Sequence, residues 1–156
     1  TELLCSDWGQ SGATADPDVV IGIKIFGNKI LIHEYFYDNA STDNDIYQVL
    51  SKSVPKKSQF FVYETATQGL SRINNLYAMG LRFRFVPAQK PPLMYSIREM
   101  KDYTLCITDT SLNVRFEQQN YNFINVKGIL QPADKNNHAL DALRYGYFYK
   151  KNNKLL

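Results

Sequence analysis

The segment from Asn136 to Tyr145 carries the residue pattern with the clearest chemical consequence. It reads Asn-Asn-His-Ala-Leu-Asp-Ala-Leu-Arg-Tyr, and its two Ala-Leu pairs predict a helix that lies close against a neighbouring element. Asp141 stands between those pairs, where a buried carboxylate is costly unless a positive group meets it. His138 lies one helical turn earlier on the same face. A metal ion would satisfy both side chains, but an internal arginine partner or simple solvent exposure would also explain Asp141.

Two further acids stand at the ends of apolar segments. Residues 2–8 and 59–64 are apolar segments typical of buried strands. Asp7 stands at the end of the first, and Glu64 is the last residue of the second. Glu64 also precedes a predicted helix, and active sites of α/β sheets are usually found at such strand ends. A polar residue that merely marks a strand end would explain Asp7, and a favourable interaction with the helix dipole would explain Glu64.

The elements around these acids must bring them together. Residues 19–26 and 29–37, joined by a Gly27-Asn28 turn, predict a hairpin that extends the first strand into an antiparallel meander. Residues 59–64, a following helix and residues 82–87 predict a strand–helix–strand unit, whose strands are parallel. The first strand should therefore lie centrally, beside the strand that ends at Glu64, with the last helix crossing both.

Local signals place the helices and the remaining strands. Capping residues and hydrophobic spacing predict helices from Ser41-Thr42-Asp43 to Lys52, from Thr65-Ala66-Thr67 to Gly80, over residues 93–103, from Asp109-Thr110-Ser111 to Asn120, and from a cap of Asp134, Asn136 and Asn137 to Tyr149. A short strand over residues 104–108 and a hairpin of residues 121–126 and 129–131 complete the pattern. Residues 150–156 are expected to form a basic tail that frays.

The predicted fold class is α/β, with a ribonuclease H-like mixed sheet of about five strands, three antiparallel and then parallel, flanked by helices and carrying an added hairpin. In that arrangement the three acids converge, and carboxylates within hydrogen-bonding distance repel one another. One or two Mg²⁺ or Mn²⁺ ions would relieve the repulsion, because hard oxygen ligands suit these ions. Two ions about 4 Å apart would clamp a phosphodiester and activate water against it.

Length and composition limit the alternatives. A chain of 156 residues with 44% hydrophobic and 13% aromatic residues predicts one packed domain. No apolar run approaches the roughly 18 residues of a membrane span, and the start lacks the pattern of a signal peptide. The net charge of +3 permits nucleic-acid binding without requiring it. Cys5 and Cys106 lie in apolar segments and are expected to be reduced core thiols.

Several motifs, spread over nearly the whole chain, together form a recognisable set. They are Asp7-Trp8-Gly9 with Asp16-Pro17, Glu64-Thr65-Ala66, Val86-Pro87-Ala88-Gln89-Lys90 before Ser96-Ile97, Glu117-x-x-x-Tyr121, the turn at Gly128, and the stretch from Asp134 to Tyr145. In this set the sequence resembles the nuclease domain of the large terminase subunit of tailed bacteriophages. The stretch from Asp134 to Tyr145 is the most specific part of the resemblance.

The resemblance implies a metal-dependent endonuclease that cuts concatemeric double-stranded viral DNA with two divalent ions, Mg²⁺ or Mn²⁺. It implies that Asp7, Glu64 and Asp141 are the catalytic metal ligands, with Asp7 the candidate to bridge both ions. Glu64 stands where an aspartate is commoner. The auxiliary candidates are Asp16, His138 and Lys90. His138 could equally bond a neighbouring backbone group, and Lys90 could be an ordinary loop lysine.

Basic residues elsewhere give a weaker signal for DNA binding. The resemblance implies that the hairpin around Lys127 lies near the site, and we expect Lys127, Arg84, Lys56 and Lys57 to contact phosphates. An ordinary solvated surface would also explain these scattered cations.

The chain has no Gly-x-x-x-x-Gly-Lys-Ser/Thr motif, so we expect no ATP hydrolysis by the phosphate-loop route. The resemblance implies that an ATPase motor domain of the same polypeptide precedes a nuclease domain over residues 1–149. It also implies the small terminase subunit and the portal protein as partners, no membrane, and a location in the cytoplasm of an infected bacterial cell. Two alternatives stay open: another ribonuclease H-like nuclease of resolvase or integrase type, and a non-catalytic DNA-binding or docking module.

Overall fold

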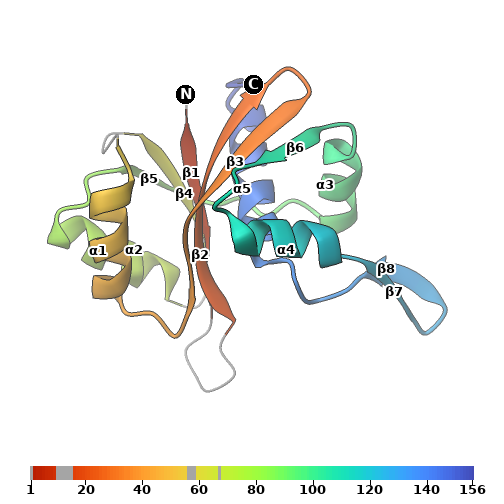
Figure 1. The fold of residues 1–156 in the computed structure, drawn as a ribbon, viewed down its shortest axis with the longest axis horizontal. Helices are drawn as coiled ribbons and strands as arrows, with labels where there is room; N and C mark the ends of the chain where they lie inside the picture. The colour runs from red at the N-terminus through yellow and green to blue at the C-terminus, as the bar shows by residue number, and fades with distance from the viewer. Residues whose placement is uncertain (1, 10–15, 56–58, 67) are drawn as a thin grey trace.

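The computed structural model describes residues 2–9, 16–55, 59–66 and 68–156, and within them the chain forms an α/β fold (Figure 1). A six-stranded mixed sheet has the order β5-β4-β1-β2-β3-β6. The strands are β1 Leu3–Asp7, β2 Pro17–Phe26, β3 Lys29–Asn39, β4 Phe60–Tyr63, β5 Arg84–Pro87 and β6 Thr104–Ile107. The helices are α1 Asp43–Ser53, α2 Gly69–Met79, α3 Leu93–Met100, α4 Leu112–Asn120 and α5 His138–Asn152.

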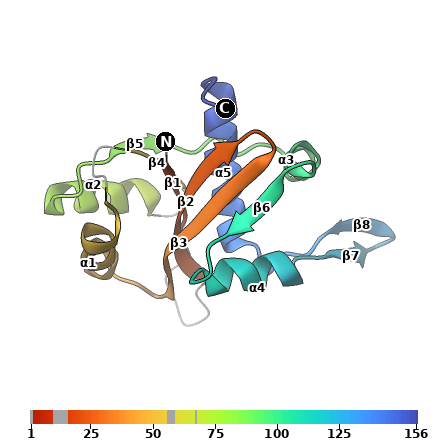
Figure 2. The same ribbon diagram turned by 45° about the horizontal axis from the view of Figure 1, so that its top comes forward.

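The strand pairing confirms both predicted units. β1, β2 and β3 form an antiparallel meander, and β1, β4 and β5 pair in parallel, so β1 is central. The sheet has one strand more than the five expected, because β6 adds in parallel to the free edge of β3. The sequence indicated β6 as a strand but held no local signal for its partner. The separate hairpin, β7 Phe123–Val126 and β8 Ile129–Pro132, projects away from the sheet in both views (Figures 1 and 2).

Helices cover both faces of the sheet. Successive side chains of β1 point to opposite sides, and those on each side are buried in a core cluster of their own. Leu3 and Cys5 belong to a core cluster with buried residues of α5 and with Val114 of α4, whereas Leu4 belongs to a second cluster with buried residues of α1 and α2. Figure 1 shows α1 and α2 on one side of the sheet and α3, α4 and α5 on the other. Every residue of β1 is buried, which explains why its sequence is apolar almost throughout until it reaches Asp7. None of the helices within the described ranges is both long and apolar enough to cross a membrane.

The helix ends follow the sequence in part. Thr42 caps α1 through a reciprocal pair of hydrogen bonds with Asp45, as the Ser41-Thr42-Asp43 signal predicted. Gly80 ends α2 with φ +120°, also as predicted. The start of α2 was predicted too early: the helix begins at Gly69, and Thr67 lies outside the described residues. A Cβ atom on Gly69 would lie 2.0 Å from the carbonyl oxygen of Glu64, so the turn after β4 requires glycine.

The last helix is longer than expected. α5 continues to Asn152, three residues beyond the boundary expected after residue 149. The extension has a physical reason, because Lys150 is buried and Lys151 forms an ion pair with Glu99 of α3. These contacts fix the backbone that the sequence pattern assigned to a fraying tail.

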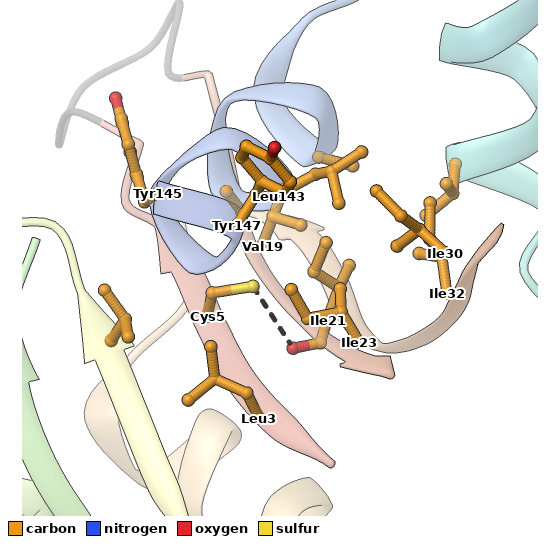
Figure 3. Packing of buried hydrophobic residues seen from close by; sticks show 14 of the residues in the cluster. Leu3, Cys5, Val19, Ile21, Ile23, Ile30, Ile32, Leu143, Tyr145 and Tyr147 are labelled. Atoms are coloured by element: carbon orange, nitrogen blue, oxygen red, sulfur yellow. Dashed lines mark hydrogen bonds between the residues drawn. The ribbon is translucent and has the colours of Figure 1, made fainter. Parts of the chain in front are cut away.

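α5 lies close against β1 at Gly146. Figure 3 shows Cys5 between the sheet and this helix, with its thiol directed at the carbonyl oxygen of Ile21. A Cβ atom on Gly146 would lie 2.8 Å from Cys5 Sγ and 2.9 Å from Ile23 Cδ1, both buried. Ala139 and Ala142 on the same helix are also fully buried, as the Ala-Leu pattern predicted. Gly146 therefore sets the distance between α5 and the sheet.

Replacing Gly146 with Ala is expected to lower the free energy of unfolding by about 1–2 kcal/mol, because overpacking outweighs the roughly 1 kcal/mol that alanine gains over glycine in a helix. Urea denaturation measures this change. The control is the Cys5→Ala, Gly146→Ala double variant, in which removal of Sγ makes room, so its loss should be smaller than the sum of the two single losses. A Gly146→Ala variant more stable than wild type would contradict the close approach.

Candidate active site

Asp7, Glu64 and Asp141 line one recess of about 220 Å³. β1 and β4 run in parallel with Cys5 opposite Val62, so the two strands end at the same level and deliver Asp7 and Glu64 side by side. Asp141 comes from the first turn of α5, which packs across β1 and β2. The other residues of the recess are Trp8, Asp16, Ala66, Lys90, Asp134, Asn137, His138 and Tyr145. The structure thus brings together the three acids that the sequence singled out.

Asp7 is buried to the same extent as Glu64 and has the largest pKa shift of the three acids. Burial raises the pKa of Asp7 from 3.8 to about 8, and a hydrogen bond with Glu64 and the negative charges of Glu64 and Asp141 contribute in the same direction. A contact of 3.3 Å between His138 Nδ1 and Asp7 Oδ2 acts in the opposite direction. Asp7 therefore holds a proton at neutral pH unless a cation enters the recess.

Glu64 is held as the ionised partner of that pair. The Trp8 amide donates to Glu64 Oε2 at 2.9 Å, and Lys90 Nζ donates to Glu64 Oε1 at 2.5 Å. Burial raises the pKa of Glu64, but the hydrogen bonds from Asp7, Lys90 and the Trp8 amide outweigh it, so the net pKa is lowered. The proton shared between the two carboxyls accordingly lies on Asp7.

Asp141 is placed both as a candidate metal ligand and as the partner of an internal arginine, two of the explanations that the sequence left open. It faces the recess, and it also accepts a hydrogen bond of 2.5 Å from Arg144 Nη2. Arg144 Nη1 in turn donates to Ser96 Oγ of α3 at 3.1 Å, so the arginine is fixed between two helices. Burial raises the pKa of Asp141 even though the positive charge of Arg144 opposes the shift.

The three auxiliary candidates also lie at the recess. His138 stands between two acids, with Nδ1 3.3 Å from Asp7 Oδ2 and Nε2 3.6 Å from Asp16 Oδ1. The hydrogen bond with Asp7 is the main reason that the pKa of His138 is raised. Asp16 is exposed and Lys90 is half-exposed, so both can reach a ligand from the solvent side.

The basic residues expected to bind DNA are not among the lining of the recess, as far as the chain is described. Lys127 lies exposed in the turn between β7 and β8, with φ +53°. Arg84 lies exposed on the edge strand β5, with its guanidinium carbon 5.3 Å from the centre of the Phe60 ring. Lys56 and Lys57 lie outside the described residues.

One supporting cluster was missed by the sequence reasoning. Asp18 is buried at the start of β2, where it accepts hydrogen bonds from the amide of Gly9 at 2.9 Å and from Arg72 Nη1 at 2.8 Å. The Arg72 guanidinium also lies 5.0 Å from the centre of the Trp8 ring. This cluster fixes the chain directly after Asp7. In the sequence, the cluster is marked by the two acids on either side of Pro17. Nothing near them indicates that Arg72, 54 residues after Asp18, is the partner.

The donor set fits a hard divalent cation in chemistry and in charge. The recess collects carboxylates whose mutual repulsion contributes to the raised pKa of Asp7, and Mg²⁺ and Mn²⁺ prefer such oxygen ligands. In the described part of the chain, no three His, Cys, Asp or Glu side chains are already arranged as ligands of one ion. The carboxylates instead hydrogen bond with Lys90, Arg144 and His138. Metal binding would have to replace some of these contacts.

Comparison with protein-family models and with curated proteins found no match. Solved structures did match. The nuclease domain of the g2p large terminase of bacteriophage SPP1, with bound Mn, has a TM-score of 0.81 at 19% identity, over 96% of this chain and 86% of that chain. The large-terminase nuclease of the thermophilic phage G20c, with bound magnesium, has a TM-score of 0.58 at 13% identity, over 94% and 81%.

A longer protein also contains this fold. The large terminase of another thermophilic bacteriophage has a TM-score of 0.64 at 18% identity, over 97% of this chain but only 39% of that chain. At these identities the likeness shows the fold. The chain therefore has the fold of the nuclease domains of phage large terminases, which confirms the fold expected from its motifs.

Proposed function

We propose that this chain is the nuclease domain of a viral large terminase subunit and that it hydrolyses phosphodiester bonds of double-stranded DNA with divalent metal ions. The observation that carries the proposal is the convergence of Asp7, Glu64 and Asp141 in one recess of this fold. Two of the structures with the same fold hold Mn or magnesium, and the donor set here suits either ion. The biological substrate would be concatemeric viral DNA.

Asp7, Glu64 and Asp141 would hold the metal ions, with Asp7 shared between two of them. Bound ions of this kind supply Lewis-acid activation of water and stabilisation of the leaving oxygen. The chain's own groups prepare the site: the Trp8 amide orients Glu64, and Lys90 balances its charge. His138, between Asp7 and Asp16, is placed to accept or return a proton at the edge of the recess.

The same fold supports a wider proposal about the protein's context. We propose that an ATPase motor domain belongs to the same polypeptide, in keeping with the longer large terminase of which this chain spans 39%. The small terminase subunit and the portal protein would be partners, in the cytoplasm of an infected bacterial cell. We further propose that Lys127 and Arg84 contact phosphates outside the recess, as exposed cations can do for any DNA sequence.

Cleavage of plain plasmid DNA tests this function. With millimolar Mn²⁺ or Mg²⁺, supercoiled plasmid is expected to be nicked and then linearised, and EDTA should stop the reaction because the proposed hydrolysis needs ion-activated water. Gel electrophoresis over time measures both steps. Cleavage restricted to branched DNA would favour a resolvase-type enzyme instead. Binding of DNA without any cleavage in either metal would favour a docking module and overturn the proposal.

A further inference from the structure

α4 contains a fully buried acid that the proposed chemistry does not use. Glu117 Oε1 accepts hydrogen bonds from the amide of Ala139 at 2.8 Å and from that of Leu140 at 3.2 Å. Its other oxygen, Oε2, accepts from the Tyr37 hydroxyl of β3 at 2.6 Å. Both carboxylate oxygens are therefore engaged, one with the start of α5 and one with the sheet.

The two amides that Glu117 binds are those that an N-cap side chain normally satisfies. α5 begins at His138, so Ala139 and Leu140 occupy its second and third positions. Asn137, at the N-cap position, makes no capping hydrogen bond through its side chain, which donates to Asp134 at 3.4 Å instead. Asn137 therefore stands at the predicted cap position, but the capping hydrogen bonds come from Glu117 of α4 and not from its own side chain.

α4 is itself capped in the same way by the sheet. Glu34 of β3 accepts hydrogen bonds of 3.0 Å from the amides of Asn113 and Val114, the second and third residues of α4. The predicted capping residue Ser111 makes no such bond, and its hydroxyl accepts from the Glu34 amide at 2.8 Å. Two successive glutamate caps therefore tie β3 to α4 and α4 to α5, and the second cap ends between His138 and Asp141.

We propose that Glu117 is a positioning residue of the candidate site, which sets where His138 and Asp141 stand relative to Asp7 by capping α5 from α4. His138 directly precedes the capped amides and Asp141 directly follows them. A negative charge at a helix N-terminus is favourable as well as geometrically specific. The inference rests on the proposed function for the cleavage measurement, whereas the amide-exchange measurement does not depend on it.

The test compares Glu117→Ala with Glu117→Gln. The glutamine oxygen can still accept from both amides, and its NH₂ group can donate to the Tyr37 oxygen, so the cap should survive. The matched control is Ile46→Ala, which removes buried volume from α1 on the opposite face of the sheet. All proteins are measured at a temperature where each is folded, so that loss of stability alone changes no readout.

In metal-free protein, Glu117→Ala is expected to speed amide exchange at Ala139 and Leu140 by at least about tenfold relative to the rest of α5, because a lost cap weakens the first turn locally. The Mn²⁺ concentration for half-maximal cleavage should rise by about 10–100-fold, as it does when a group that orients metal ligands is removed. Glu117→Gln and Ile46→Ala should each stay within about threefold of wild type in both readouts.

Two results would overturn the proposal: wild-type exchange at Ala139 and Leu140 in Glu117→Ala, or an Mn²⁺ dependence that moves equally in Ile46→Ala. Failure of wild type to cut DNA in any metal would overturn the proposed function, and the exchange measurement would then decide the positioning role by itself.

Discussion

Asp7→Asn and Asp141→Asn are each expected to slow metal-dependent DNA cleavage by at least about 10³-fold, because each removes several kcal/mol of metal-assisted stabilisation at about 1.4 kcal/mol per tenfold. Asparagine keeps the shape of the side chain but removes the anionic oxygen that a divalent ion prefers. The fold should survive, since neither change leaves a cavity in the core. Conversion of supercoiled plasmid in Mn²⁺, followed on gels, measures the rates.

The matched control is Asp109→Asn, which removes the same charge from a fully exposed side chain that pairs with Arg115 at 3.7 Å. It should cut at the wild-type rate, and circular dichroism should show all three variants folded. Wild-type cleavage by either recess variant would show that its acid does not hold a metal, even with the fold unchanged. The site would then have to be sought elsewhere in the chain.

The recess could be predicted because each of its acids breaks an apolar pattern. Asp7 and Glu64 follow segments whose burial on both faces makes them nearly continuous apolar runs, and the first three strands form the meander that the Gly27-Asn28 turn predicts. Once β1 and β4 are parallel neighbours, the two acids have to meet at one edge. This part of the site follows from local composition and from the rules of chain connection.

The contacts that hold the recess could not be predicted, because they join residues with no local relation. Glu117 caps amides 22 and 23 residues away, and Glu34 caps amides 79 and 80 residues away along the chain. In both helices the neighbouring Ser, Asp or Asn residues are good caps by type, and the tertiary carboxylates replaced them. The same limit applies to Arg72, whose partner Asp18 comes from a strand far away in the sequence.

The close contact at Gly146 was also hidden in the sequence. A glycine inside a helix is destabilising in isolation, so the pattern indicated a tolerated residue near the end of a helix. Its role appears only when α5 is placed on β1, where Cys5 Sγ and Ile23 Cδ1 lie so near that a Cβ atom on residue 146 would force them to shift. The tail was misjudged for a related reason, because the partner of Lys151 is Glu99 on another helix.

In metal-free protein, Asp7→Asn is expected to raise the free energy of unfolding at pH 8–9 by about 2 kcal/mol or more. A pKa difference of one unit corresponds to about 1.4 kcal/mol, and the expected gain is set well below the full product because the protein and water relax around a buried charge. Burial raises the pKa of Asp7 from 3.8 to about 8 in the folded protein. The folded state therefore binds the proton more tightly than the unfolded state. The stabilising contribution is complete below about pH 4 and is lost as the pH rises to about 8.

His138 also loses a stabilising contribution as the pH rises, because its hydrogen bond with Asp7 raises its pKa in the folded protein. Asp7→Asn removes the titration of residue 7 and weakens the pKa shift of His138. Wild type in EDTA should thus lose stability between about pH 5 and pH 9 in urea titrations, while Asp7→Asn should change much less. Asp109→Asn, whose carboxylate is exposed, should follow wild type. A wild-type stability that stays flat over this range would contradict the charge crowding inferred for the recess.

At about pH 8, divalent ions should reverse the order of stability of wild type and Asp7→Asn. Metal binds the ionised carboxylates, so Mn²⁺ should stabilise wild type by mass action and release protons, whereas Asp7→Asn should gain little. The melting temperature of wild type should therefore rise with Mn²⁺ concentration, and more steeply at about pH 8 than at about pH 6. The same carboxylate that destabilises the metal-free fold would then be the one that makes the site bind its ions, which ties the cost of burying Asp7 to its proposed function.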